Sequence, residues 1–96
     1  MKYTVLDYKG FENDLVMKNT NVLDNGLSYV FVFDNGYGAS VIKHKYSYGN
    51  ENDLFELAIL DKNGEITNDT YITNDVLGWL TNEEVIECFK QIQSLQ

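Results

Sequence analysis

The sequence predicts an α+β fold: an antiparallel β-sheet of about four to five strands, connected as a hairpin meander, with a C-terminal amphipathic α-helix packed on one face. The first observation is a set of three Asn-Gly pairs, at Asn25-Gly26, Asn35-Gly36 and Asn63-Gly64, which separate runs rich in β-branched and aromatic residues. An Asn-Gly pair tolerates the positive φ that a tight hairpin turn requires. The second observation is a change to helical hydrophobic spacing near the C-terminus.

Taken in order along the chain, the expected elements begin with a strand at residues 2–8, where apolar and polar side chains alternate. Residues 9–19 predict a short helix, because Phe11 and Leu15 lie one helical turn apart. Residues 20–46 predict a strand, a turn, a strand, a turn and a strand. Residues 53–67 predict a strong strand, a tight turn and a short strand.

The last two segments are residues 74–80, which are mostly apolar, and the amphipathic segment that follows them. Residues 74–80 are expected to tuck under the sheet as a turn or short helix. Thr81 is a natural N-cap residue, and Glu84 three positions later completes a capping box for the helix that follows. Its apolar positions recur at helical spacing: Val85, Phe89 and Ile92. Cys88 falls on the same side of the helix and is expected to behave as a buried small hydrophobe.

The hairpin around Asn35-Gly36 raises a question about what covers the sheet. If this pair is a two-residue loop, Phe33 pairs with Gly38 and the register follows from there. One face of the hairpin then presents Tyr29, Phe31 and Phe33, and the other presents Val30, Val32, Ala39 and Val41. Because neither face is polar, one helix cannot cover both. The second face is covered by the N-terminal segment, by a second copy of the chain in a homodimer, or by a partner on an open aromatic face.

The charge of the chain limits its partners. The 96 residues, expected to form a single domain spanning 1–96, carry 15 acidic residues, seven lysines and no arginine, for a net charge of −8. Residues 46–96 hold ten acids and two lysines, which accounts for the whole −8. Such a surface disfavours nucleic acid and anionic membranes and favours a basic protein partner. A contribution to solubility alone is the other explanation of the acidity.

The N-terminal residues lack the apolar core of a secretory signal, and no apolar run approaches the length of a membrane span. The single cysteine fits a reducing compartment. The protein is therefore expected in a cytoplasm.

No motif in the chain predicts catalysis or a cofactor. Gly36-Tyr37-Gly38 lacks the third glycine and the following helix of a dinucleotide-binding loop. Residues 61–72 start like a calcium-binding loop, but Ile66 and Ile72 stand where a glycine and a bidentate carboxylate are needed. A turn with a glycine bulge explains residues 61–65 better. His44 is the only histidine, so no histidine-based metal site is expected. We therefore expect a protein that is not an enzyme and has neither cofactor nor metal.

The candidate partner-binding residues are the aromatic and acidic side chains of the loops on either side of residues 54–60. Tyrosines among adaptable polar residues are typical of binding loops. An alternative is that Tyr46 and Tyr48 simply end a strand and cap the core. The candidates are Tyr46, Tyr48, Glu51, Asp53, Asp61, Glu65 and Asp69.

Four stretches of the chain, NGYGASVI, YSYG, LFELAIL and TYITNDVLGWLTNEEV, together resemble a family of short proteins carried by phages and prophages of Gram-positive bacteria. The resemblance runs from about Tyr29 to Phe89. That family has no assigned activity, so no site residue can be transferred from it. The resemblance implies an accessory phage gene expressed inside a bacterial host.

These observations lead to one principal functional hypothesis and two alternatives. The principal hypothesis is a non-enzymatic phage accessory protein that binds and inhibits a host protein, in an anti-defence or host-takeover role. Its acidic surface would engage a basic one, as in nucleic-acid mimicry. The alternatives are a small-ligand or nucleotide-binding homo-oligomer with ligands at an aromatic seam, and a structural or regulatory phage protein.

Overall fold

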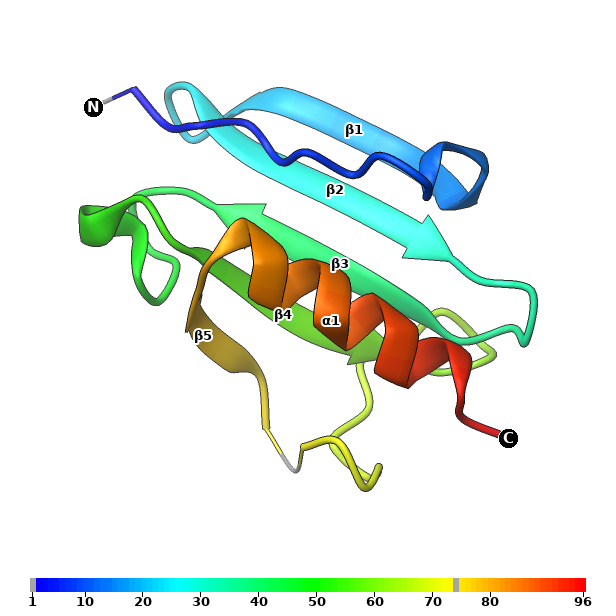
Figure 1. The fold of residues 1–96 in the computed structure, drawn as a ribbon. Coiled ribbons are helices and arrows are strands. Elements are labelled where there is room, and N and C mark those ends of the chain that lie inside the picture. The colour runs from blue at the N-terminus through cyan, green and yellow to red at the C-terminus, as the bar shows by residue number, and fades with distance from the viewer. Residues whose placement is uncertain (1, 74) are drawn as a thin grey trace.

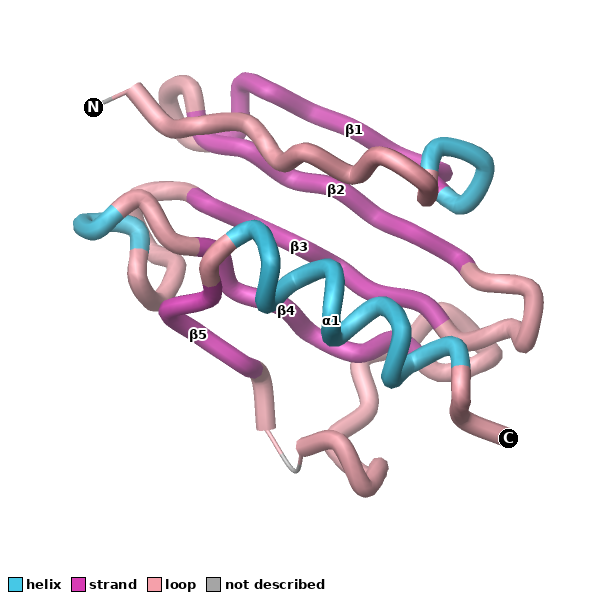
Figure 2. Tube along the Cα trace, viewed as in Figure 1, coloured by secondary structure: helices cyan, strands magenta, loops and turns pink. Residues whose placement is uncertain are grey.

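The computed structural model describes residues 2–73 and 75–96, and within them it shows one five-stranded antiparallel sheet and one α-helix (Figures 1 and 2). The strands lie in chain order, so the sheet is a meander. This confirms the predicted α+β fold. The strands are β1 (Leu15–Val22), β2 (Gly26–Val32), β3 (Gly38–Lys43), β4 (Phe55–Leu60) and β5 (Leu77–Leu80), and the helix is α1 (Asn82–Gln93).

The helix and the N-terminal segment lie on the same face of the sheet, which we call the inner face (Figure 1). The N-terminal strap, residues 2–10, crosses the side of β1 and β2, and α1 covers β3 and β4. Residues 2–8 of this strap were predicted to be a strand, and that prediction is wrong. It runs over the sheet rather than along an edge, so its contacts are to side chains. The Leu6 backbone N–H donates to the Tyr29 hydroxyl at 3.1 Å, and the Asp7 N–H donates to Asn82 Oδ1 at 2.7 Å.

Two other predicted elements differ in the structure. The short helix expected at residues 9–19 is only a 3₁₀ turn, η1 (Glu12–Asp14), followed by β1. Pairing of β1 with β2, including Leu15 opposite Phe31, outweighs the helical spacing of two apolar residues. Residues 77–80 form the edge strand β5 rather than a turn or helix. Of the segment predicted there, Asn74 lies outside the described residues.

The β2–β3 hairpin has a register one residue away from the predicted one. Its loop is three residues long, with a hydrogen bond from Phe33 N to Tyr37 O at 2.8 Å and with Gly36 at φ +91°. A three-residue loop of this kind places glycine in the left-handed region. Phe31 therefore pairs with Ala39, not with Ser40. The shift moves Ser40 and Ile42 to the outer face of the sheet, so that face of the hairpin combines serine side chains with Val30, Val32 and Ile42.

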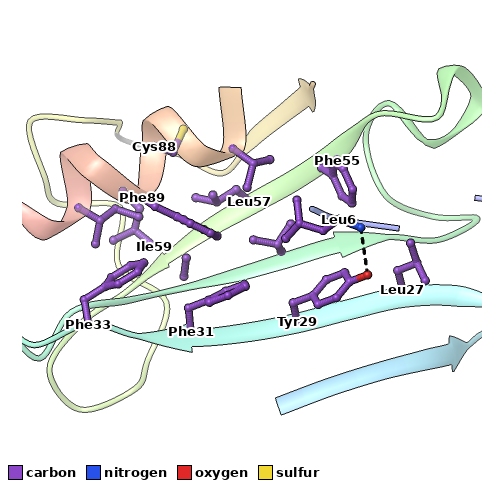
Figure 3. Packing of buried hydrophobic residues seen from close by; sticks show 14 residues of the cluster. Leu6, Leu27, Tyr29, Phe31, Phe33, Phe55, Leu57, Ile59, Cys88 and Phe89 are labelled. Atoms are coloured by element: carbon purple, nitrogen blue, oxygen red, sulfur yellow. Dashed lines mark hydrogen bonds between the residues drawn. The ribbon is translucent and has the colours of Figure 1, made fainter. Parts of the chain in front are cut away.

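The inner face contains the core, including the three aromatic residues that were expected to face a partner (Figure 3). Tyr29 and Phe31 are fully buried, and Phe33 is 3% exposed. Phe89 of α1 packs against Phe31 with ring centres 4.6 Å apart, and Phe11 packs against Phe89 at 5.1 Å. Of the three coverings considered, the structure shows the N-terminal segment, which together with α1 buries these aromatic side chains, so they form no open face for a second copy or a partner.

The helix and the turn after β4 form as predicted. Thr81 caps α1 and forms the reciprocal capping box with Glu84. Cys88 is buried, and burial first, then the charges of Glu84 and Glu87, raise the pKa of its thiol. In the turn after β4, Gly64 adopts φ +79° and donates its N–H to Asp61 O at 2.9 Å. The short strand expected after this turn is reduced to a single bridge, between Leu60 and Ile66.

Candidate binding surface at the aromatic end

The predicted partner-binding residues divide between the two ends of β4. Tyr46, Tyr48, Glu51 and Asp53 lie in the loop before β4, whereas Asp61, Glu65 and Asp69 lie after it. Six strand residues separate the groups by about 17–20 Å, and Figure 1 shows the two loops at opposite ends of the strand. We call residues 44–54 together with β5 the aromatic end, and residues 61–73 the acidic tip. The predicted set is therefore not one surface.

The feature that defines the aromatic end is a pair of exposed aromatic rings. Tyr48 and Trp79 stack with ring centres 5.5 Å apart and an angle of 18° between the rings. Although packed on each other, they are 56% and 58% exposed. Their backbones are also joined, because Trp79 N donates to Tyr48 O at 3.3 Å. The pair is therefore a fixed apolar surface on the outside of the molecule.

An irregularity in β5 turns Trp79 outward. Phe55 pairs with Leu80 and Leu57 pairs with Leu77, so two residues of β5, Gly78 and Trp79, stand opposite one residue of β4. Such a bulge re-aims a side chain. In this bulge Trp79 adopts φ +54°, a left-handed conformation that is unfavourable for a bulky residue. Strained backbone of this kind is concentrated at functional sites.

Two glycines make room for the stack. A Cβ added to Gly78 would lie 2.6 Å from the Cβ of Tyr48, and one added to Gly49 would lie 2.8 Å from the Cα of Trp79. Gly49 also has φ +96°. The loop can approach β5 this closely only because both positions lack a side chain.

Glu56 and Glu51 each accept one hydrogen bond in this part of the molecule, and Glu56 is the one that contacts the aromatic pair. Glu56 is the β4 residue opposite the bulge, and its Oε1 accepts the Tyr48 N–H at 2.9 Å. Glu51 Oε1 accepts from Asn50 Nδ2 at 2.6 Å. Each contact uses one oxygen of its carboxylate. The other oxygen of each, Oε2, accepts no hydrogen bond from the residues that the structure describes.

Tyr46 belongs to this end but is arranged differently. It is 73% exposed, and the Nζ of its neighbour Lys45 lies 5.4 Å from its ring centre. Its N–H donates to Nδ1 of His44 at 3.1 Å. Tyr46 therefore stands at the rim, with a cation of the chain itself already over its ring.

Asp53 was predicted to contact a partner, but it holds the fold together. Its carboxylate forms an ion pair with the buried Lys43 at 2.9 Å and accepts the Thr4 backbone N–H at 2.9 Å. Lys43 also donates to Thr4 O at 2.9 Å and lies 3.7 Å from the ring centre of Phe55. Burial alone would raise the pKa of Asp53, but the hydrogen bonds from Thr4 and Lys43 and the charge of Lys43 lower it overall. These contacts fasten the strap to the β3–β4 loop.

The carboxylates of the acidic tip make no comparable contact with distant parts of the described chain. Asp61 accepts hydrogen bonds from Asn63 N at 2.8 Å and Glu65 N at 3.0 Å, which closes its own turn. Glu65 and Asp69 are exposed, and their carboxylates accept no hydrogen bond from the described residues. The carboxylates of Glu65 and Asp69 are therefore not held in place by other residues of the described chain.

Trp79 was missed as a site residue, because the apolar run around it was expected to be buried. A signal was nevertheless present. Leu77 and Leu80 both face inward from β5, yet they are three positions apart, a spacing that strict alternation in a strand does not allow. An inserted residue has to intervene, and it is the inserted region that turns the tryptophan outward.

No group of acidic, histidine and cysteine side chains suited to a metal ion occurs in the described part of the chain. Within the same residues, no helix has the length and apolar character to cross a membrane. No family model, curated protein or solved structure matches this sequence. The geometry of the aromatic end is therefore the basis of the functional argument.

Proposed function

We propose that this protein is a non-enzymatic binding protein and that its aromatic end contacts a basic surface of a protein partner. The observation that carries the proposal is the exposed Tyr48–Trp79 stack on a left-handed backbone. Tyrosine and tryptophan are enriched among the residues that dominate binding energy at protein interfaces. Because the stack is already fixed, a partner would not have to order these side chains on binding.

The charge distribution supports a basic partner. Glu56 lies beside the stack, where it accepts the Tyr48 N–H, and residues 46–96 as a whole carry ten acids against two lysines. Complementary charge speeds encounter and excludes partners of like charge. The interaction is therefore expected to weaken as salt is added, because exposed charges are screened over about 10 Å at 0.1 M ionic strength.

The biological context follows from the resemblance to short phage and prophage proteins. In this proposal the protein acts in the cytoplasm of a bacterial host as an accessory factor that inhibits a host protein. A host protein that grips nucleic acid offers the kind of basic surface that an acidic protein would occupy. An anti-defence or host-takeover role would follow from blocking that surface.

The alternative of a ligand-binding homo-oligomer has lost its structural basis. It required Tyr29, Phe31 and Phe33 to form an open seam, and these side chains are buried beneath the strap and α1. The alternative of a structural or regulatory phage protein stays a prediction.

The proposal is tested by affinity capture from a lysate of a Gram-positive host at low and high salt, with bound proteins identified by mass spectrometry. We expect a specific protein with a basic surface to be retained at low salt and lost at high salt. The Tyr48→Ala variant should fail to retain it. The control is Ile66→Ala, which removes a 61% exposed side chain at the acidic tip and should retain it fully. Equal capture by both variants, or capture insensitive to salt, would contradict the proposal.

A further inference from the structure

We propose that the Tyr48–Trp79 stack binds an arginine side chain, with the guanidinium lying on an aromatic ring and hydrogen-bonded to Glu56. This inference rests on the proposed function and identifies the chemical group that the partner presents. It concerns the outer ring faces, since the facing sides of the two rings are packed against each other.

The ring faces are suited to a cation. The face of an aromatic ring is the negative end of its quadrupole, and tryptophan is the strongest of the aromatic side chains in this interaction. Guanidinium is planar and more weakly hydrated than an ammonium group, so it can lie flat on a ring at a smaller cost of desolvation. A stacked pair of fixed rings thus favours arginine over lysine.

The chain already uses this contact with its own lysines. The Nζ atoms of Lys18, Lys43, Lys45 and Lys62 lie between 3.7 and 5.8 Å from the ring centres of Tyr8, Phe55, Tyr46 and Tyr37. Among the residues that the structure describes, none of these lysines is placed over Tyr48 or Trp79. The largest exposed aromatic pair is therefore left for a cation from outside, in a chain that has no arginine of its own.

The neighbouring carboxylate of Glu56 provides the second half of the contact. Glu56 is held in place by the Tyr48 N–H through Oε1, and its Oε2 accepts nothing from the described residues. A guanidinium has N–H donors around its rim, so it can stack with its face while it donates in plane to a carboxylate. An uncharged ligand would gain the stacking but not this ionic hydrogen bond.

The inference can be tested by fluorescence, because Trp79 is the only tryptophan in the chain. The titrants are three capped peptides in which glycine alternates with arginine, lysine or citrulline. We expect the arginine peptide to change Trp79 emission saturably and to bind about tenfold more tightly than the lysine peptide. The citrulline peptide, which has the same shape but no charge, should bind more weakly than the arginine peptide, because it gains the stacking without the ionic hydrogen bond. Equal affinity for arginine and lysine, or no saturation with arginine, would overturn the inference.

Matched variants show where the peptide binds. Tyr48→Ala should weaken binding of the arginine peptide by about tenfold or more, and Glu56→Gln should reduce the preference for arginine over citrulline. The control is Glu65→Gln, which makes the same change of charge at the acidic tip and should leave the titration unchanged. A backbone NMR spectrum of each variant establishes that it is folded. If Glu65→Gln weakens binding as much as Glu56→Gln, net charge rather than the aromatic end is responsible and the inference is wrong.

Two outcomes separate this inference from the proposed function. If a lysate partner is captured through Tyr48 while the arginine peptide does not bind, the binding function stands and the arginine contact is wrong. If the arginine peptide binds at the stack while no partner is captured, the contact stands and the proposed function fails. A neutral oligosaccharide that alters Trp79 emission more strongly than the arginine peptide would identify a carbohydrate platform and overturn the inference.

Discussion

The two ends of β4 carry acidic residues in similar number, but they are built differently. At the aromatic end, Asp53 and Glu56 are engaged with groups from other parts of the chain, a buried lysine and the strap in one case and the backbone of Tyr48 in the other. At the acidic tip, Asp61 contacts only its own turn, and the carboxylate of Asp69 contacts none of the described residues. The number of charges therefore does not distinguish the two ends, whereas the partners of the carboxylates do.

The largest expected effect concerns Asp53. Asp53→Asn keeps a residue that tolerates the left-handed backbone at φ +60° but removes the charge opposite Lys43, which is 1% exposed. Breaking a fully buried ion pair costs about 3–5 kcal/mol. Because the Asp53 side chain is 37% exposed, we expect a loss of roughly 2–3 kcal/mol in the free energy of unfolding.

Urea denaturation measures this difference, and Asp69→Asn is the matched control at the acidic tip. That variant should change the free energy of unfolding by less than about 0.5 kcal/mol, as expected for an unpaired surface residue. Similar losses in the two variants would mean that the ends do not differ as the contacts indicate.

The second effect concerns the glycines. Gly78→Ala places a Cβ 2.6 Å from the Cβ of Tyr48, so the loop has to move away from β5. We expect a loss of about 1–3 kcal/mol in the free energy of unfolding from overpacking, together with a change in Trp79 emission as the stack is disturbed.

Gly64→Ala is the control, because it lies at the acidic tip with open space around it. Its positive φ costs about 1 kcal/mol, and Trp79 emission should not change. A folded Gly78→Ala protein with the emission of the original would show that the stack does not depend on this close approach.

The parts of the fold that could be predicted from the sequence are those determined by local turn and helix-cap signals. The capping box at Thr81 and the turn that Asp61 closes form through hydrogen bonds within a few residues, so the local sequence pattern is sufficient to predict them. The register of the β2–β3 hairpin, in contrast, is not determined by local hydrogen bonds alone. A two-residue and a three-residue loop both fit Asn35-Gly36, and the choice depends on packing of Phe31 and Phe33 against α1.

The candidate site could be predicted only in part, for the same reason. Tyr46 and Tyr48 were found because they stand in a polar loop. Trp79 was not, because its exposure depends on pairing between β4 and β5 that lies outside any local pattern. The structural role of Asp53 was equally hidden, since its partners lie ten residues away at Lys43 and 49 residues away at Thr4.

A smaller effect is expected at the acidic tip itself. Asp61→Ala removes the acceptor for two backbone N–H groups of the turn after β4. The cost should be about 1 kcal/mol, because these groups are exposed and water can replace the lost bonds. Trp79 emission and arginine-peptide binding should remain as in the original protein. A change in either would mean that the two ends of β4 are coupled, which their separate contacts do not indicate.

The last prediction concerns how the free energy of unfolding depends on pH. The ionised forms of two aspartates should contribute to it with opposite signs. The pKa of Asp53 is lowered in the folded protein, so its contribution to stability is complete above the unfolded value of about 3.9 and is lost as the pH falls below it. The pKa of Asp14, in η1, is raised by burial and by the nearby charge of Asp34. Its ionised form therefore opposes folding at neutral pH, and that penalty disappears as the pH falls.

Urea denaturation between pH 7 and pH 3 separates the two aspartates. Asp53→Asn should be less stable than the original protein at pH 7, and the difference should narrow in acid. Asp14→Asn should be slightly more stable at pH 7, and its advantage should also vanish in acid because the original residue is then protonated. In acid, both variants therefore approach the stability of the original protein, Asp53→Asn from below and Asp14→Asn from above. A destabilised Asp14→Asn at pH 7 would show that hydrogen bonding, rather than repulsion and burial, dominates at that end of the sheet.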